Sequence, residues 1–228
     1  MEGSAALRRF PSCEQQYREG VVLLGSLLTA DGEALYRLRP DVIVSAGDLP
    51  FDYLENLVTR ANVPLVYVPG NHDPDVTTAG ARSDGLWSVP EDVLPGPQGC
   101  DTADGRIVEA GGLRIAGLGG SIRYKEGPNQ YTQSQMRWRA LRLEARARVR
   151  LGFGGTLDVL VTHAPPLGVG DGEDPAHQGF EALHRLVAQL RPRLLVHGHV
   201  HPVHRKALDR ELGTTRVVNA IPYKLLEL

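Results

Sequence analysis

The chain has 228 residues, of which 42% are hydrophobic and 23% are charged, with a formal net charge of −2. This length suits one large domain, and the near-neutral charge gives no general attraction to nucleic acid or to an acidic membrane. Two cysteines are too few for a disulfide framework. No apolar run approaches the ~20 residues that span a bilayer, and residues 1–20 lack the apolar stretch of a secretory signal, so we expect a cytoplasmic protein.

Short apolar runs alternate with helical patterns along the chain, which indicates an α/β layer fold. Buried strands are predicted at residues 21–27, 41–47, 64–70, 157–163 and 193–199, and amphipathic helices at residues 51–61 and 179–190. Residues 106–119, with a Gly111-Gly112 turn, and residues 214–228 are also strand-like and predict a second, largely antiparallel sheet. No linker divides the chain. We therefore expect a single domain over residues 1–228, with residues 1–20 as a poorly ordered extension.

Several of the predicted strands end in polar residues that are common metal ligands. These residues are Asp48, Asn71, His72, His163, His199 and His201. A carboxylate, an amide and several imidazoles supply the mixed oxygen and nitrogen donors that divalent transition metals take. Taken singly, an Asp after a strand can cap a helix, and an Asn-His pair can shape a turn. Strand alternation would send His197, His199 and His201 to one face, and metal ligation of at least two of them is favoured there.

The order of these motifs resembles that of the calcineurin-like metallophosphoesterases, whose pattern is DxH, GDxxD, GNH[D/E], a lone His and GHxH. The matching stretches, in order and in local context, are Gly47-Asp48, Gly70-Asn71-His72-Asp73, His163 and Gly198-His199-Val200-His201. Longer strings such as SAGDLPFDYLE and VPGNHDPD further resemble an uncharacterised bacterial branch of that superfamily. The resemblance implies a four-layer α/β/β/α sandwich of the metallo-dependent phosphatase type. It also implies a hydrolase, a phosphatase or phosphodiesterase, acting on a phosphate monoester or diester.

Residue roles follow from the resemblance. Asp48 would bridge two metal ions, Asn71, His163 and His199 would complete one metal position, and His201 would bind the other. His72 would face the phosphate as a general acid, and Asp73 would orient it. The donor set favours Mn, Fe or Zn. Arg123 is a separate candidate for contact with a substrate phosphate, because its planar guanidinium matches phosphate oxygens; a surface arginine is the equal alternative.

The pattern departs from the family at the first motif, where Ser26 and Leu28 replace the Asp and the His. We therefore expect one tight metal site and a second that is weak or absent. Asp31, Asp52 and residues 168–177 could supply replacement ligands, although turn or loop roles are favoured for Asp31 and for the 168–177 loop. The lost motif also supports an alternative function, a catalytically impaired module that binds metal or phosphate.

A basic stripe marks the helical segment at residues 132–150. It consists of Arg139, Arg142, Arg146 and Arg150. The stripe could contact a polyanion, but a solvated helix face is favoured. We expect a small phosphorylated substrate as the partner, with neither a membrane nor a nucleic acid, and the oligomeric state is left open.

Overall fold

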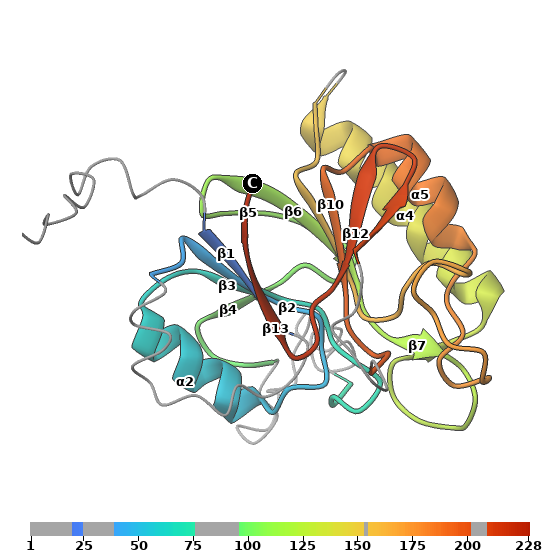
Figure 1. Cartoon of the computed structure of the whole chain (residues 1–228), viewed down its shortest axis with the longest axis horizontal. Helices are drawn as coiled ribbons and strands as arrows, with labels where there is room; N and C mark the ends of the chain where they lie inside the picture. The colour runs from blue at the N-terminus through green and yellow to red at the C-terminus, as the bar shows by residue number, and fades with distance from the viewer. Residues whose placement is uncertain (1–19, 25–38, 76–95, 153–154, 202–208) are drawn as a thin grey trace, which may run out of the picture.

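A computed structural model describes residues 20–24, 39–75, 96–152, 155–201 and 209–228 of the chain (Figure 1). The first of its two large sheets has the strand order β13-β1-β2-β3-β4. Its strands are β1 (Gly20–Leu24), β2 (Val42–Ser45), β3 (Leu65–Tyr67), β4 (Cys100–Thr102) and β13 (Tyr223–Glu227). Strands β1 to β4 are parallel, whereas β13 runs antiparallel to β1 at one edge.

The second large sheet has the order β11-β12-β10-β9-β6-β5. Its strands are β5 (Ile107–Ala110), β6 (Leu113–Leu118), β9 (Val159–Thr162), β10 (Leu194–His197), β11 (Arg210–Leu212) and β12 (Thr215–Asn219). The four central strands are parallel, and each edge strand is antiparallel to its neighbour. Two short parallel strands, β7 (Ser121–Ile122) and β8 (Gln130–Tyr131), form a third, small sheet.

The prediction of a separate, largely antiparallel sheet is wrong. The hairpin about Gly111 and Gly112 does form, but its strand β6 pairs in parallel with β9. The C-terminal segment divides between the sheets, because β12 pairs with β10 while β13 pairs with β1. Local patterns showed strands here, but the choice of partner depends on contacts far away in the chain.

Three helices are present among the described residues, and they lie close to the predicted ranges. They are α2 (Phe51–Ala61), α4 (Gln133–Leu151) and α5 (Ala182–Leu190). Helix α4 begins with a capping box in which Thr132 and Gln135 each satisfy a backbone N–H of the other. None of these helices is long and apolar enough to cross a membrane.

Three apolar clusters show how these elements pack. Alternation along β2 sends Ile43 to one face of the first sheet and Val44 to the other. The cluster that contains Ile43 joins that sheet to α2, and the cluster that contains Val44 joins the two sheets. The third cluster, which contains Leu143 and Leu186, joins the second sheet to α4 and α5. Figure 1 shows α2 and the pair α4 and α5 on opposite sides of the sheets. This order of packing agrees with the α/β/β/α arrangement that the resemblance implies.

The packing also positions the predicted ligands. Asp48 and Asn71 follow β2 and β3, neighbouring parallel strands of the first sheet. His163 and His199 follow β9 and β10, neighbouring parallel strands of the second. Carboxyl ends of parallel strands meet at one edge of a sheet, so each sheet presents two candidate ligands at its edge.

Candidate metal centre

The turn after β2 places Asp48 by a close approach of two backbone segments. Gly47 has φ +92°, and a Cβ on it would lie 2.4 Å from the amide nitrogen of Gly70. A Cβ on Gly70 would in turn lie 2.0 Å from Oδ1 of Asp48. That Oδ1 atom accepts the backbone N–H of His72 at 2.9 Å. Only glycine therefore allows the two turns to fit together at these positions.

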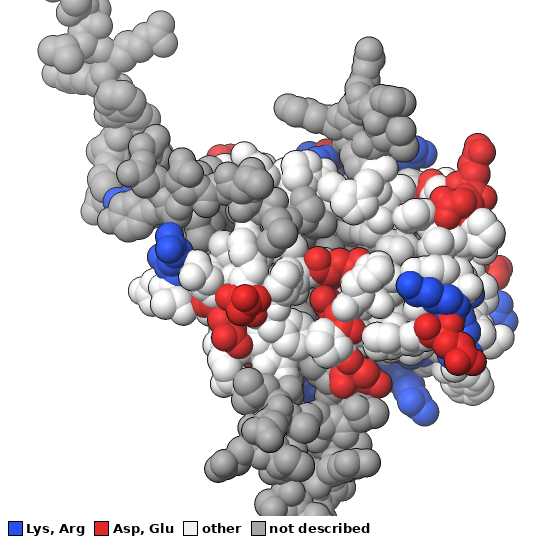
Figure 2. Space-filling view, turned by 90° about the horizontal axis from the view of Figure 1, so that it is seen from below, with Lys and Arg blue, Asp and Glu red and all other residues white. Residues whose placement is uncertain are grey.

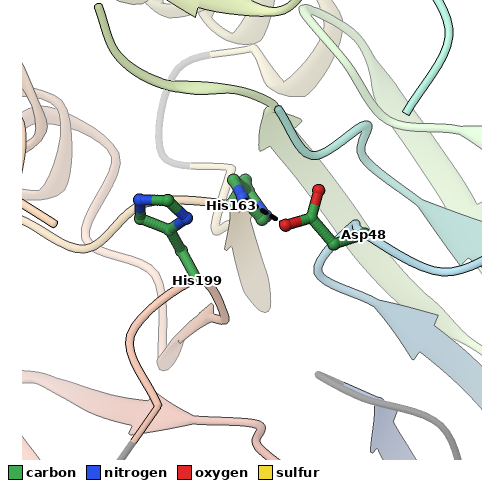
Figure 3. Close-up of side chains that lie close together, drawn as sticks. All are labelled: Asp48, His163 and His199. Atoms are coloured by element: carbon green, nitrogen blue, oxygen red, sulfur yellow. Dashed lines mark ion pairs between the residues drawn. The ribbon is translucent and has the colours of Figure 1, made fainter. Parts of the chain in front are cut away.

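His163 is fully buried and lies between atoms of both sheets. Its Nδ1 lies 2.7 Å from the carbonyl oxygen of Ala46, an arrangement in which Nδ1–H donates. Its Nε2 lies 3.0 Å from Oδ1 of Asn71 and 3.4 Å from Oδ2 of Asp48. Figure 3 shows the Asp48 carboxylate pointing at the His163 ring, and the dashed line marks this pair.

His199 completes the group from the other side. Its Nε2 lies 2.8 Å from the carbonyl oxygen of Ala176, so this nitrogen donates and Nδ1 keeps its lone pair. One nitrogen of the ring points toward His163 and Asp48 (Figure 3), and the two imidazole centroids are 4.8 Å apart. Asp48, His163 and His199 each offer one ligand atom, and these atoms all lie within 4.8 Å of one another.

Charge and burial set the ionisation of these groups. Burial raises the pKa of Asp48, but the hydrogen bond and charge of His163, together with the N–H and charge of His72, outweigh it and lower this pKa to about 2. Burial and the neighbouring His163 lower the pKa of His199 to about 4. At neutral pH the site thus contains a carboxylate anion and a neutral imidazole.

This donor set fits a divalent metal ion. With Nδ1 of His163 and Nε2 of His199 used as donors, the neutral form of both rings leaves only acceptors at the centre: two ring nitrogens, the Asp48 carboxylate and the Asn71 amide oxygen. A single proton satisfies two acceptors at most, whereas a metal ion satisfies all four. Imidazole, carboxylate and amide oxygen are donors that divalent metal ions take in proteins, and no sulfur is among them.

The turn that carries Asn71 is held by buried polar groups. Oδ2 of Asp73 accepts the backbone N–H of Gly70 at 2.7 Å and that of Asp48 at 3.0 Å. Burial raises the pKa of Asp73 despite these two bonds. From the neighbouring loop, the side chain of Asn129 donates to the carbonyls of Gly70 and Asp73, each at 3.0 Å. Asp73 thus joins the two ligand-bearing turns, and Asn129 braces the turn that carries Asn71.

Comparison with known proteins agrees with this geometry. The sequence model for the calcineurin-like phosphoesterases matches residues 23–203, most of the chain. The chain belongs to this family. Membership indicates a metal-dependent phosphoesterase and supports the fold and the metal centre together. No curated protein matches the chain.

Solved structures share the fold. One crystal structure has a TM-score of 0.61 and 16% identity, and the match covers 92% of this chain and 95% of that one. A second, the crystal structure of TT1561 of Thermus thermophilus, has a TM-score of 0.56 and 17% identity, with 89% of each chain covered. At such identities the likeness shows the fold alone.

Two of the family roles can be compared with the structure directly. The side chain of His72 is exposed beside the centre, where it could meet a substrate. The role expected of Asp73 differs from what the structure shows, because its carboxylate binds the backbone of Gly70 and Asp48 rather than the ring of His72. Asp73 therefore supports the turn.

The expected common face for His197, His199 and His201 is wrong. Strand β10 ends at His197, and His199 has φ +62°, which breaks the alternation. His197 is buried beside the loop that follows β9, since a Cβ on Gly170 would lie 3.1 Å from its Nε2. His201 is exposed and lies outside the group formed by Asp48, His163 and His199 among the described residues. Its place in a second metal position stays a prediction.

Arg123 is held by contacts with β8 and α4. It is exposed, and its Nη2 donates to the Gln130 carbonyl at 3.3 Å and to Oε1 of Gln135 at 3.2 Å. The next residue, Tyr124, reaches the centre instead, because its hydroxyl accepts from Nδ2 of Asn71 at 3.4 Å. Sequence reasoning marked this loop but chose the arginine over the tyrosine. Contact between Arg123 and a substrate stays a prediction.

The remaining candidates lie outside the group formed by Asp48, His163 and His199 or beyond the described residues. Asp52 is exposed in the first turn of α2, where Oδ1 accepts the N–H of Tyr53 at 2.9 Å. Ser26, Leu28 and Asp31 fall outside the part of the chain that the structure describes. In the loop at 168–177, Asp171 accepts the N–H of Gly179 at 3.1 Å, while Asp174 and His177 pair with each other.

The basic stripe on α4 is only partly solvated. Arg139 donates to both carboxylate oxygens of Asp104, at 2.5 and 2.6 Å, and to the carbonyl of Gly119 at 2.7 Å. Its guanidinium also stacks 4.1 Å from the ring centroid of Tyr131. This residue thus ties α4 to the loop after β6, while Arg142, Arg146 and Arg150 are exposed.

Proposed function

We propose that this chain hydrolyses a small phosphate monoester or diester, using a divalent Mn, Fe or Zn ion held by Asp48, Asn71, His163 and His199. The observation that supports this is the convergence of these four side chains, two from each large sheet, which leave only acceptor atoms facing one another when both imidazoles are neutral. When bound, such an ion polarises a phosphoryl oxygen and makes its water more acidic.

The residues around the centre can handle the substrate. His72 donates its backbone N–H to Asp48, and its exposed imidazole is free to protonate the leaving oxygen. The Tyr124 hydroxyl accepts from Asn71 and keeps its own proton available for a phosphate oxygen. Asp48 stays ionised throughout the neutral range, because its pKa is about 2. We assign proton donation to His72 and phosphate contact to Tyr124.

A small substrate is favoured over a polymeric one. On the face shown in Figure 2, the coloured acidic and basic side chains form separate small groups, and no broad basic surface is seen among them. Arg139 of the α4 stripe is already engaged with Asp104. A polyanion binds mainly through many such positive charges, so these observations favour a small phosphorylated molecule.

A second candidate function is a binding module that retains one metal position but does not turn over substrate. The exposed position of His201, outside the acceptor group, supports it. So does the replacement of the first family motif by Ser26 and Leu28. A single ion gives less stabilisation of the attacking and leaving oxygens than a pair does.

Hydrolysis assays separate the two functions. The protein would be stripped with a chelator, reconstituted with Mn, Fe or Zn, and assayed with p-nitrophenyl phosphate and bis(p-nitrophenyl) phosphate. We expect metal-dependent release of nitrophenol, absent from Asp48→Asn and retained by the control Asp101→Asn, an exposed carboxylate on β4. Tight metal binding without hydrolysis would favour the binding module. Absence of metal binding would reject the centre itself.

A further inference from the structure

The segment from Asp171 to Gly179 contacts His199 in two ways. The carbonyl oxygen of Ala176 accepts Nε2–H of His199 at 2.8 Å. The next residue, His177, packs its ring against the same imidazole, with centroids 5.0 Å apart and an interplanar angle of 40°. One face and one nitrogen of His199 are thus fixed by adjacent residues of this loop.

His177 is anchored in turn by Asp174. Its Nδ1 lies 2.9 Å from Oδ1 and 2.8 Å from Oδ2 of that carboxylate. Oδ1 of Asp174 also accepts the backbone N–H of Ala176 at 3.1 Å, and the carbonyl of His177 accepts the N–H of Gly172 at 2.9 Å. Asp174 therefore holds the imidazole of His177 and the peptide of Ala176 at once.

We propose that Asp174 and His177 are positioning residues that hold the Ala176 carbonyl and the His177 ring against His199 and so select Nδ1 of His199 as its metal-binding atom. The inference rests on the metal centre of the proposed function, although not on hydrolysis. Groups that bind the second nitrogen of a ligating histidine fix its tautomer and ring orientation, and their removal typically costs about 10–100-fold in metal affinity. The carbonyl of Ala176 occupies that position here.

Because Asp174 and His177 are exposed, their effect on metal binding can be separated from any effect on folding. The side chains of His177 and Asp174 are 39% and 56% exposed. Exposed ion pairs contribute little to the stability of a fold. Their loss should therefore leave metal-free folding nearly unchanged while it weakens metal binding. If the two residues had only a structural role, their loss would instead destabilise the metal-free fold.

Metal titrations test the proposal. Dissociation constants for Zn²⁺ and Mn²⁺ would be measured for the wild type, His177→Ala, Asp174→Ala and Asp174→Asn. We expect about 10–100-fold weaker binding for the two alanine variants and partial recovery in Asp174→Asn, because asparagine keeps an acceptor for the imidazole and the Ala176 N–H. Glu173→Gln is the matched control, since it removes the same charge from a neighbouring exposed residue. It should bind metal like the wild type.

Two further readouts separate positioning from folding. Thermal unfolding of the metal-free proteins should be alike, and long-range ¹H–¹⁵N NMR should show one tautomer of His199, protonated at Nε2, in the wild type but a mixture in His177→Ala. Unchanged metal affinity and tautomer in both alanine variants would overturn the proposal. So would a loss of affinity matched by a loss of metal-free stability. A wild type that binds metal without hydrolysing phosphate esters would refute the proposed function and leave this test intact.

Discussion

Nε2 of His163 lies 3.4 Å from Oδ2 of Asp48, although the two residues follow strands of different sheets. Asp48 follows β2 and His163 follows β9, so this contact joins the two sheets at one edge. Two acceptors at this distance repel unless a proton or a cation lies between them. Because Asp48 and His163 come from different sheets, the geometry of the candidate metal centre depends on how the two sheets pack.

Removal of a ligand should abolish tight metal binding. Asp48→Asn and His199→Ala each delete one of the converging acceptors, and we expect metal-dependent hydrolysis to disappear in both. His201→Ala should keep the tight ion, because His201 lies outside the group. Elemental analysis of the purified proteins checks this. Loss of the tight ion from His201→Ala would show that the centre includes that residue.

The general-acid role of His72 predicts a loss that depends on the leaving group. His72→Ala should lower turnover by roughly 10²–10⁴-fold on esters with poor leaving groups, and far less on p-nitrophenyl esters, whose leaving group needs no proton. Metal content should stay near that of the wild type, since the hydrogen bond from His72 to Asp48 comes from the backbone N–H, which the variant keeps. Equal losses on both kinds of ester would contradict the role.

Close packing of the two turns predicts a steric effect at Gly70. A Cβ there would lie 2.0 Å from Oδ1 of Asp48, so Gly70→Ala must displace the carboxylate and should cost both stability and metal affinity. Gly213→Ala is the control, because Gly213 has φ +63° with no atom within 4 Å of the added Cβ. That change should cost about 1–2 kcal/mol in unfolding free energy and leave metal binding unchanged.

The replaced first motif predicts the metal stoichiometry. Elemental analysis should find close to one tightly bound ion per chain, and hydrolysis should be slow or require excess metal. The double change Ser26→Asp with Leu28→His supplies a carboxylate and an imidazole, and should raise both the second occupancy and the rate. Two tight ions in the wild-type chain would show that other residues, such as Asp31 or Asp52, serve as ligands.

Buried histidines predict how the metal-free protein responds to acid. Burial lowers the pKa of His197 from 6.5 to about 4, so the folded state resists a proton that the unfolded chain accepts. The free energy of unfolding should therefore fall as the pH drops from about 6.5 to about 4, by up to roughly 3 kcal/mol from this residue, and should level off below that range. Denaturant unfolding of the wild type and His197→Gln at several pH values measures it. The free energy of unfolding of the variant should change less with pH than that of the wild type. An equal pH dependence in the two proteins would exclude His197 as the cause.

The sequence by itself determined the α/β class and named the residues that converge at the candidate metal centre. Apolar runs with β-branched residues marked the strands, and the helix at Phe51–Ala61 was predicted with its observed bounds because its apolar spacing has the helical period. Asp48, Asn71, His163 and His199 were named, together with His72 and His201, because polar residues that follow buried parallel strands gather at one sheet edge, and the family resemblance then implied their separate roles. The single domain over residues 1–228 stays a prediction.

The tertiary structure decided what local patterns do not encode. Strands β12 and β13 joined different sheets because pairing depends on distant partners, and the positive φ of His199 ended the alternation that was expected to place His197, His199 and His201 on one face. The carbonyls of Ala46 and Ala176 bind the ligating histidines, yet backbone groups have no signature in a sequence. Which nitrogen of each ring is left as an acceptor for a metal ion was therefore fixed only once residues far apart in the chain had packed together, because a hydrogen bond to one nitrogen of an imidazole determines the state of the other.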